Sequence, residues 1–345
     1  MLLESRPDIA KYIRKLAYEV ENTFDDRPPV TDDYLLSPIL PNLLRTISRL
    51  NCLKISALNF GWNKINPFLT SAFLHLMHLP TINHIGLSSI SNFPMSSLRP
   101  SVNLLRLDIS NLDCIDLHGK EIVFQSGMMP QIREFRTSDS PKLTTTLLHA
   151  KRQDDGQPAF NIMNLRRLSS CLEDKRNLLY LLQNAKLLEE LYITVECGQN
   201  LEGLHDVLSA SARTLKVLGF TTLIYETYYN SFPQPLEGVC EGLEVLAGHD
   251  MLETLSFEIE VFADYEETVD SIGSLIQNVE KVLAKPGWSA LRQIFFKVPI
   301  TGCLKRAELS EALQSLPDKY LSHLSKLDSI DFNFSASVVK CAFEY

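Results

Sequence analysis

The stretch Asn103-Leu104-Leu105-Arg106-Leu107-Asp108-Ile109-Ser110-Asn111-Leu112 decides the fold, because it sets apolar residues at positions 104, 107, 109 and 112. The alternation of Leu107 and Ile109 has a period of two, which predicts a short β-strand with one buried face. Leu104 stands upstream of this strand, where we expect it to pack as the chain turns into the strand. One such unit cannot bury its apolar face alone, so it needs neighbours of the same kind.

The same pattern recurs along the whole chain. Clear copies begin at Leu50, Ile82, Leu188, Leu215, Leu252, Leu291 and Leu327, and weaker copies begin at Ile13, Ile132 and Leu165. Together they make about eleven units, separated by roughly 22 to 39 residues. This period is typical of leucine-rich repeats, although the unit lengths are irregular.

Helical patterns, with apolar residues at three-to-four spacing, lie between the predicted strands. They cover 67–78, 174–184, 201–210, 239–247, 265–285 and 307–316. Strand, helix and strand joined by short links predict a parallel sheet with right-handed crossovers. The predicted fold class is therefore α/β, an irregular leucine-rich-repeat-like right-handed solenoid or horseshoe, with parallel strands on the concave face and helices on the convex face. We expect one solenoid over 1–345, with loops near 21–33, 151–158 and 225–235.

The position just after the strand departs from the usual pattern of such repeats, which place Asn or Cys there to bond the backbone of the turn. This chain has Leu58, Ile90 and Leu112 instead. The polar backbone groups of these turns must therefore find other partners. This favours an irregular, intracellular type of repeat.

Charge and hydropathy exclude several classes of partner. The formal net charge of −9 disfavours binding to nucleic acid, which needs a basic face, and docking on an anionic membrane. The basic pairs Lys151-Arg152 and Arg166-Arg167 are short and isolated. The first residues do not form a secretory signal, and no apolar run is long enough to span a membrane. We expect a monomer in the cytoplasm or nucleus that binds neither nucleic acid nor membrane.

The candidate chemical groups do not assemble into a motif for catalysis, cofactor or metal binding. The seven cysteines (52, 114, 171, 197, 240, 303 and 341) are widely spaced without Cys-x-x-Cys, which argues against a disulfide framework and a zinc site. His75 and His78 have a spacing that could share a metal, with His84 nearby, but we interpret them as partly exposed residues. The acidic run Glu258, Glu260, Asp264, Glu266, Glu267 and Asp270 lacks a calcium-loop spacing and predicts a solvated rim. The chain is therefore not expected to be an enzyme.

Two stretches resemble fungal F-box and leucine-rich-repeat-like proteins. One runs from Trp62 to Leu112 and includes Pro67-Phe68-Leu69, Leu79-Pro80-Thr81-Ile82 and Asn103-Leu104-Leu105-Arg106-Leu107. The other is Pro7-Asp8-Ile9-Ala10-Lys11-Tyr12-Ile13-Arg14-Lys15-Leu16, similar to the first repeat of those proteins. The resemblance implies a role as substrate receptor: the F-box binds Skp1, an adaptor of cullin-type ubiquitin ligases, and the repeats capture the substrate.

The chain departs from this family at the F-box itself. Met1 to Arg6 is too short to hold one. Leu40-Pro41-Asn42-Leu43-Leu44 mimics the Leu-Pro start of the module, but it lies directly ahead of the strand near Leu53, so we predict a repeat helix there. Two interpretations stay open: a fragment whose F-box lies upstream, or a relative that has lost ligase recruitment and serves as an interaction scaffold.

The concave face is the expected binding surface, because residues between the buried strand positions point there. Its mixture of polar, charged and aromatic side chains is suited to a protein partner. The predicted partner-binding residues are Arg106, Asp108, Arg136, Arg167, Tyr192, Thr194, Glu258, Phe295 and Lys297. No catalytic, cofactor-binding or metal-binding residues are predicted.

Overall fold

The computed structural model describes residues 7–20, 39–94, 98, 103–113, 123–124, 130–152, 155–172, 175–196, 203–225, 238–262, 267–301, 311–320 and 330–339. The chain divides into two compact units, 1–165 and 166–345. The single solenoid expected over 1–345 stays a prediction. The loop predicted at 21–33, and all but residue 225 of the loop near 225–235, lie outside the described residues.

Unit 1 is built on strands that pair side by side in chain order, every pair parallel. These strands are β1 (Lys15–Val20), β2 (Cys52–Gly61), β3 (His84–Ser91), β4 (Arg106–Ser110) and β6 (Glu134–Ser138). Its helices are η1 (Pro7–Tyr12), α3 (Ile39–Arg45), η2 (Trp62–Lys64), α4 (Pro67–Met77) and α5 (Pro141–His149). Helix α3 confirms the repeat helix predicted at Leu40 to Leu44.

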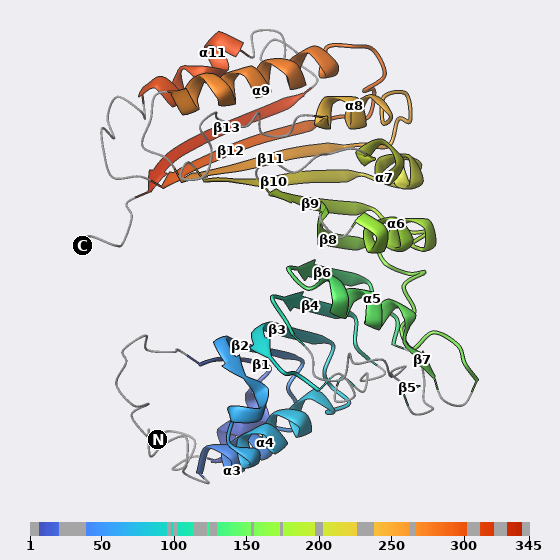
Figure 1. Ribbon diagram of the computed structural model, residues 1–345, viewed down its shortest axis with the longest axis vertical. Helices are drawn as coiled ribbons and strands as arrows, with labels where there is room; N and C mark the ends of the chain where they lie inside the picture. The colour runs from blue at the N-terminus through green and yellow to red at the C-terminus, as the bar shows by residue number, and fades with distance from the viewer. Residues whose placement is uncertain are drawn as a thin grey trace. The chain divides into compact units, whose positions relative to one another are not determined.

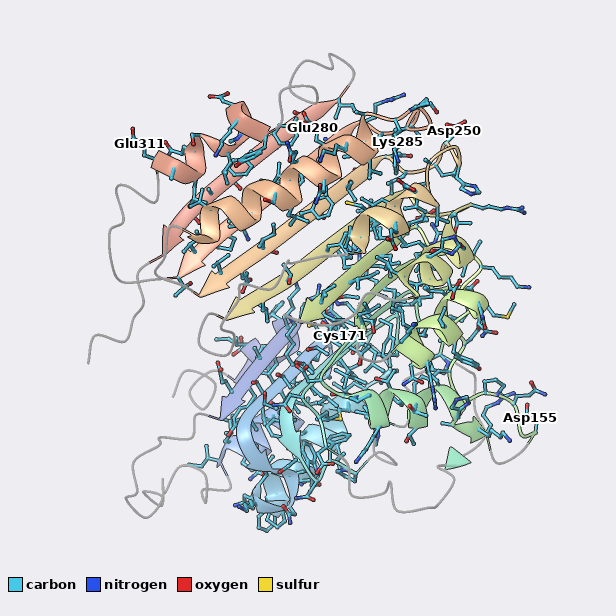
Figure 2. All side chains as sticks on the ribbon, turned by 45° about the horizontal axis from the view of Figure 1, so that its top comes forward. Asp155, Cys171, Asp250, Glu280, Lys285 and Glu311 are labelled. Atoms are coloured by element: carbon cyan, nitrogen blue, oxygen red, sulfur yellow. The ribbon has the colours of Figure 1, made fainter. Side chains whose placement is uncertain are left out.

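Part of the predicted loop near 151–158 is instead a short strand, β7 (Lys151–Arg152). It pairs in parallel with β5 (Val123–Phe124) as a separate two-stranded sheet. The turn that follows contains Asp155, whose carboxylate pairs with Arg152 (Figure 2). The basic pair Lys151-Arg152 is therefore tied into local structure.

Unit 2 follows the same plan with longer strands, again all parallel and in chain order (Figure 1). The strands are β8 (Arg167–Cys171), β9 (Glu190–Glu196), β10 (Val217–Tyr225), β11 (Thr254–Phe262), β12 (Gln293–Thr301) and β13 (Asp331–Val339). The helices are α6 (Lys175–Asn184), α7 (Leu204–Ser211), α8 (Val239–Glu244), α9 (Glu267–Leu283) and α11 (Leu316–Tyr320).

The helices of unit 2 pack against one another in sequence, α6 on α7, α7 on α8 and α8 on α9. Figure 1 shows this succession beside strands β9 to β12. Figure 2 shows Glu280 on α9 and Lys285 just beyond the end of that helix. Lys285 pairs with Glu244 of α8, so an exposed ion pair also joins these two neighbours.

A shared backbone contact fixes the register at the start of eight strands, β2, β3, β4, β6, β9, β10, β11 and β12. The carbonyl of Arg14, the residue before β1, accepts hydrogen bonds from the amides of Asn51 and Cys52 at 2.8 and 3.1 Å. The carbonyl of Asn51 in turn accepts from Asn83 and His84, both at 3.0 Å. The same arrangement recurs at the carbonyls of Asn83, Leu105, Arg166, Glu189, Lys216 and Glu253. Equivalent residues near the starts of these strands therefore lie in register, and the pairing of β2 with β3 shifts only further along, between Ser56 and Phe60.

The core lies between the strands and the helices, as the repeat pattern predicts. Leu107 and Ile109 of β4 are buried, and so are Leu53 and Ile55 of β2. In unit 2 the inward face of α9, including Ile272 and Ile276, is also buried. The alternate strand positions are mostly half-buried or exposed in the described residues, and we call this side of each sheet the open face.

One predicted core position lies on the other side of the sheet. The repeat pattern assigns Leu223 to the interior, but Leu223 is half-buried and Thr222 is 1% exposed. Strand β10 is nine residues long, so its alternation continues past Phe220 without a turn. The period of two therefore carries Thr222 inward and Leu223 outward.

At Leu112, one of the turns that lack Asn or Cys, a serine from the next repeat supplies the missing backbone partner. The amide of Leu112 donates to the Oγ of Ser140 at 2.9 Å, and that hydroxyl donates to the carbonyl of Ser138 at 3.0 Å. Ser140 and Leu112 are both buried. The hydroxyl thus replaces the side-chain partner that the usual repeat supplies within its own turn.

Candidate functional site

A hollow of about 320 Å³ opens on the open face of unit 2. It is lined by residues of strands β9 to β13, and among them Gly219 has no side chain to fill its place in the row. We call it the Gly219 hollow and define it by Tyr192, Gly219, Ser256, Glu258, Phe295 and Lys297. Register places Tyr192, Gly219, Ser256 and Phe295 in one row of neighbouring strands. The row therefore has an aromatic residue at either side of two small ones.

Tyr192 is held in place over Gly219. A Cβ atom at Gly219 would lie 2.5 Å from Cδ1 of the Tyr192 ring, so only glycine lets the ring lie this close. The hydroxyl of Tyr192 donates to Oε2 of Glu190 at 3.2 Å. Glu190 also accepts from the Nε and Nη2 atoms of Arg167 at 2.6 and 2.8 Å. One wall of the hollow is thus fixed before any partner arrives.

The next row of the hollow carries an ion pair. Glu258 on β11 lies in register with Lys297 on β12, and their side chains form a salt bridge. The hydrogen bond and charge of Glu258 raise the pKa of Lys297 above its ordinary value. Both groups are solvent-accessible, so the pair orders the rim and contributes little to stability.

Arg106 and Asp108 form a second site, on the open face of unit 1. The guanidinium of Arg106 donates to both carboxylate oxygens of Asp108 at 3.0 to 3.2 Å, and its Nη1 donates to Glu134 at 3.2 Å. His84 on β3 contacts Oδ2 of Asp108 through Nε2 at 2.9 Å. Burial alone would raise the pKa of Asp108, but the hydrogen bonds and charges of His84 and Arg106 outweigh it and lower the pKa to about 2.

Asp108 should therefore support stability in a defined pH window. Its folded pKa of about 2 lies below the ordinary value of 3.8, so the stabilisation is present above pH 4 and is lost as the pH falls towards 2. The shift corresponds to about 1–2 kcal/mol after allowance for water screening at this partly exposed site. We expect Asp108→Asn to lower the unfolding free energy by that amount at pH 7. In urea titrations from pH 7 to pH 2, the gap to wild type should close between pH 4 and 2; a gap of constant size would contradict this account.

The remaining predicted site residues are placed as follows. Thr194 is half-buried and lies next to Thr221, a lining residue of the Gly219 hollow, in register. Arg136 is exposed and lies in register with Asp108. The predicted set therefore falls into two groups, Arg106, Asp108 and Arg136 in unit 1, and Arg167, Tyr192, Thr194, Glu258, Phe295 and Lys297 in unit 2.

Sequence reasoning missed the environment of His84. It placed His84 with His75 and His78, yet those two lie on or just after helix α4, with exposed side chains, whereas His84 begins a strand. Alignment of the repeat units would have shown the link, because His84 and Arg106 each precede the first buried residue of a strand. They therefore share a row, which lies two residues before the row of Asp108.

Several negative findings apply to the described part of the chain. No group of three or more His, Cys, Asp or Glu residues there could hold a metal ion. No helix among these residues is long and apolar enough to cross a bilayer. Of the acidic run, Glu258 and Glu260 lie on β11, while Asp264 and Glu266 fall outside the described residues. The basic pair Arg166-Arg167 meets the carboxylates of Glu189 and Glu190.

No protein-family model and no curated protein matches the sequence. Among solved structures, the chain is similar to an internalin from Listeria monocytogenes, with 10% sequence identity and a TM-score of 0.32 over 98% of this chain and 84% of the internalin. So distant a likeness adds nothing to what the strand pairing shows. The repeating burial pattern, the parallel strands and the intervening helices define an α/β protein with a leucine-rich-repeat-like fold.

Proposed function

We propose that this chain is a protein-binding repeat domain, without enzymatic activity, and that its partner docks on the open face of unit 2. The observation that carries the proposal is the Gly219 hollow. Its side walls are aromatic, and a hydrogen bond already holds the Tyr192 wall in place. Its volume of about 320 Å³ has room for a large side chain. Buried aromatic anchors of this kind supply most of the binding energy at protein interfaces.

The chemistry of the hollow favours one type of occupant. Tyr192 and Phe295 offer apolar ring surface to an aromatic or aliphatic side chain. Among the described open-face side chains of unit 2, Arg167 and Lys297 are outnumbered by acids: Glu190, Glu258, Glu260 and Asp331. An acidic surface attracts a basic partner. The proposed occupant is therefore an extended polypeptide segment with an apolar anchor flanked by Lys or Arg.

The resemblance to F-box and leucine-rich-repeat-like proteins suggests a specific role for such binding. On that interpretation the partner is a substrate, and an F-box elsewhere in the native protein recruits Skp1 and a cullin. The alternative is an interaction scaffold without a ubiquitin role. A cytosolic or nuclear location, which the widely spaced cysteines favour, belongs to the same proposal.

Quantitative affinity purification from the protein's own cells, expressed from the native locus, tests the proposal. The informative variant is Tyr192→Ala with Phe295→Ala, and the matched control is Leu187→Ala, an exposed apolar residue of unit 2 outside the hollow. We expect the recovered amount of each specific partner to fall about tenfold or more with the double variant, as it does when hot-spot residues are removed. With the control variant the recovery should stay at the wild-type level.

Skp1 and cullin distinguish the two roles. Their recovery with the wild type and with the double variant supports the receptor role, because an F-box would bind them away from the hollow. Their absence, with other specific partners present, would leave the scaffold. Unchanged recovery of every partner by a folded double variant would exclude the hollow as the docking site.

A further inference from the structure

Cys52 and His84 form a close pair on the open face of unit 1, whereas the proposed docking site belongs to unit 2. They begin strands β2 and β3 and lie in register, with Sγ of Cys52 at 3.1 Å from Nδ1 of His84. The next residues on β2, Leu53 and Ile55, alternate into the core, so the thiol points to the opposite side, the side of exposed Lys54. Cys52 is 9% exposed.

The neighbours of His84 orient the imidazole for proton transfer. The Asp108 carboxylate is a hydrogen-bond acceptor, so Nε2 of His84 carries the proton and donates it in a hydrogen bond to Oδ2 of Asp108, at 2.9 Å. Arg106 holds that carboxylate with three further hydrogen bonds and keeps it anionic. The remaining ring nitrogen, Nδ1, then presents its lone pair to the Cys52 thiol, which donates S–H to it. The order of groups is thiol, imidazole, carboxylate and guanidinium.

We propose that Cys52 is a nucleophilic thiol with His84 as its general base, and that it is a covalent modification site for soft carbon electrophiles such as α,β-unsaturated carbonyl compounds. The arrangement couples a nucleophile to a base, and the base to a group that orients it, which is the requirement for base-assisted attack. This proposal is independent of binding at the Gly219 hollow.

The reaction is a conjugate addition. As the sulfur attacks the β-carbon and the C–S bond forms, the thiol proton passes to Nδ1 of His84 and the C=C π electrons move onto the carbonyl as an enolate. The imidazolium, stabilised by Asp108, returns the proton to the α-carbon. All atoms of thiol and electrophile remain in the adduct, so no leaving group or further reactant is required.

Local electrostatics explain why the base matters. Burial raises the pKa of the Cys52 thiol, partly offset by the charges of Lys54 and Lys15. The thiol is therefore protonated at neutral pH, and its proton must leave during attack rather than beforehand. His84 is the group positioned to take it.

The backbone around Cys52 and His84 favours one covalent addition per protein molecule over repeated catalytic acyl transfer. The amide of Cys52 donates to the carbonyl of Arg14, and the amide of His84 donates to the carbonyl of Asn51. Both are committed to the sheet, so neither is available to stabilise an oxyanion as acyl transfer requires. The geometry therefore supports a stoichiometric modification site, consistent with a binding protein.

Cys240 on α8 provides a matched internal control. It is more exposed than Cys52, and burial raises its thiol pKa as well. Its charged neighbours include Glu244 and Glu241, which raise the pKa further. By exposure alone Cys240 should react first, whereas base assistance predicts that Cys52 does.

The test is site-resolved labelling of the full chain by N-ethylmaleimide at neutral pH, followed over time by peptide mass spectrometry. We expect Cys52 to react about tenfold faster than Cys240 in the native protein, and the two rates to converge in guanidinium chloride. His84→Gln should lower the labelling rate of Cys52 about tenfold and leave the labelling rate of Cys240 unchanged. Asp108→Asn should lower the labelling rate of Cys52 by a smaller factor.

Two results would overturn the proposal. One is a native Cys52 rate at or below that of Cys240, which needs no variant and so does not depend on whether a substitution folds. The other is an unaltered Cys52 rate in His84→Gln. A constant Cys240 rate, together with an unchanged circular dichroism spectrum, shows that each variant is folded.

Discussion

Replacing Phe257 with alanine is expected to lower the free energy of unfolding by about 3–5 kcal/mol, the range for large aromatic side chains in a core. Phe257 is 1% exposed and stacks between two other rings of the core. Its ring centroid lies 5.6 Å from that of Phe220 and 4.7 Å from that of Phe296, with interplanar angles of 15° and 16°. The substitution would open a cavity and remove two stacked pairs, each worth about 0.5–1.5 kcal/mol. Urea unfolding followed by circular dichroism measures the change.

Phe68→Ala is the control for this measurement. Phe68 lies near the start of α4 and is 61% exposed, so its removal leaves no cavity. We expect a change within about 0.5 kcal/mol. A loss below about 1 kcal/mol for Phe257→Ala would show that the three rings do not form a packed core in solution.

Ser140→Ala should cost about 1–3 kcal/mol, although it removes a single oxygen atom. The hydroxyl is the acceptor for the buried amide of Leu112, and alanine would leave that amide without it. A second buried pair lies beside it, in which the hydroxyls of Thr137 and Thr144 are 2.7 Å apart and Thr144 also donates to the Ser140 carbonyl. The loss therefore exceeds the net value of an ordinary exposed hydrogen bond.

Thr146→Ala, on helix α5 directly after Ser140, is the control for this prediction. The Thr146 hydroxyl is exposed and donates to the carbonyl of Lys142 within α5. Its removal should be neutral or slightly stabilising, because alanine favours helix more than threonine does. Equal destabilisation of Ser140→Ala and Thr146→Ala in urea titrations would contradict the proposed role of Ser140 in the turn.

Sequence periodicity predicts the parts of this fold that depend on burial alone. The strand alternation of period two places four residues on the buried face, and all four are buried: Leu53, Ile55, Leu107 and Ile109. Helix α5 was not predicted, although Pro141 precedes Leu143, Leu147 and Leu148 with helical spacing. Its three consecutive threonines have a low helix propensity, and packing of the buried leucines overrides it.

The sites depend on information that periodicity does not contain. The Gly219 hollow exists because a glycine faces a tyrosine one strand away, and the pattern within one unit says nothing about the neighbouring unit. Cys52, His84 and Asp108 are likewise far apart in sequence. An alignment of the repeats on their first buried strand residue predicts which residues of each site lie on neighbouring strands. The directions of their side chains come only from the three-dimensional structure.

The double hydrogen bond made by the carbonyl just before a strand, which recurs at eight positions, has a consequence for how such a protein can evolve. Because it aligns the repeats that share it at the same end, strands of five residues, as in β4, and of ten residues, as in β2, differ only at their far ends. Insertions and deletions beyond that anchor leave the alignment of the sheet intact. Whole units could therefore be duplicated or lost by recombination, and the open face could be recombined unit by unit while each junction keeps the same backbone geometry.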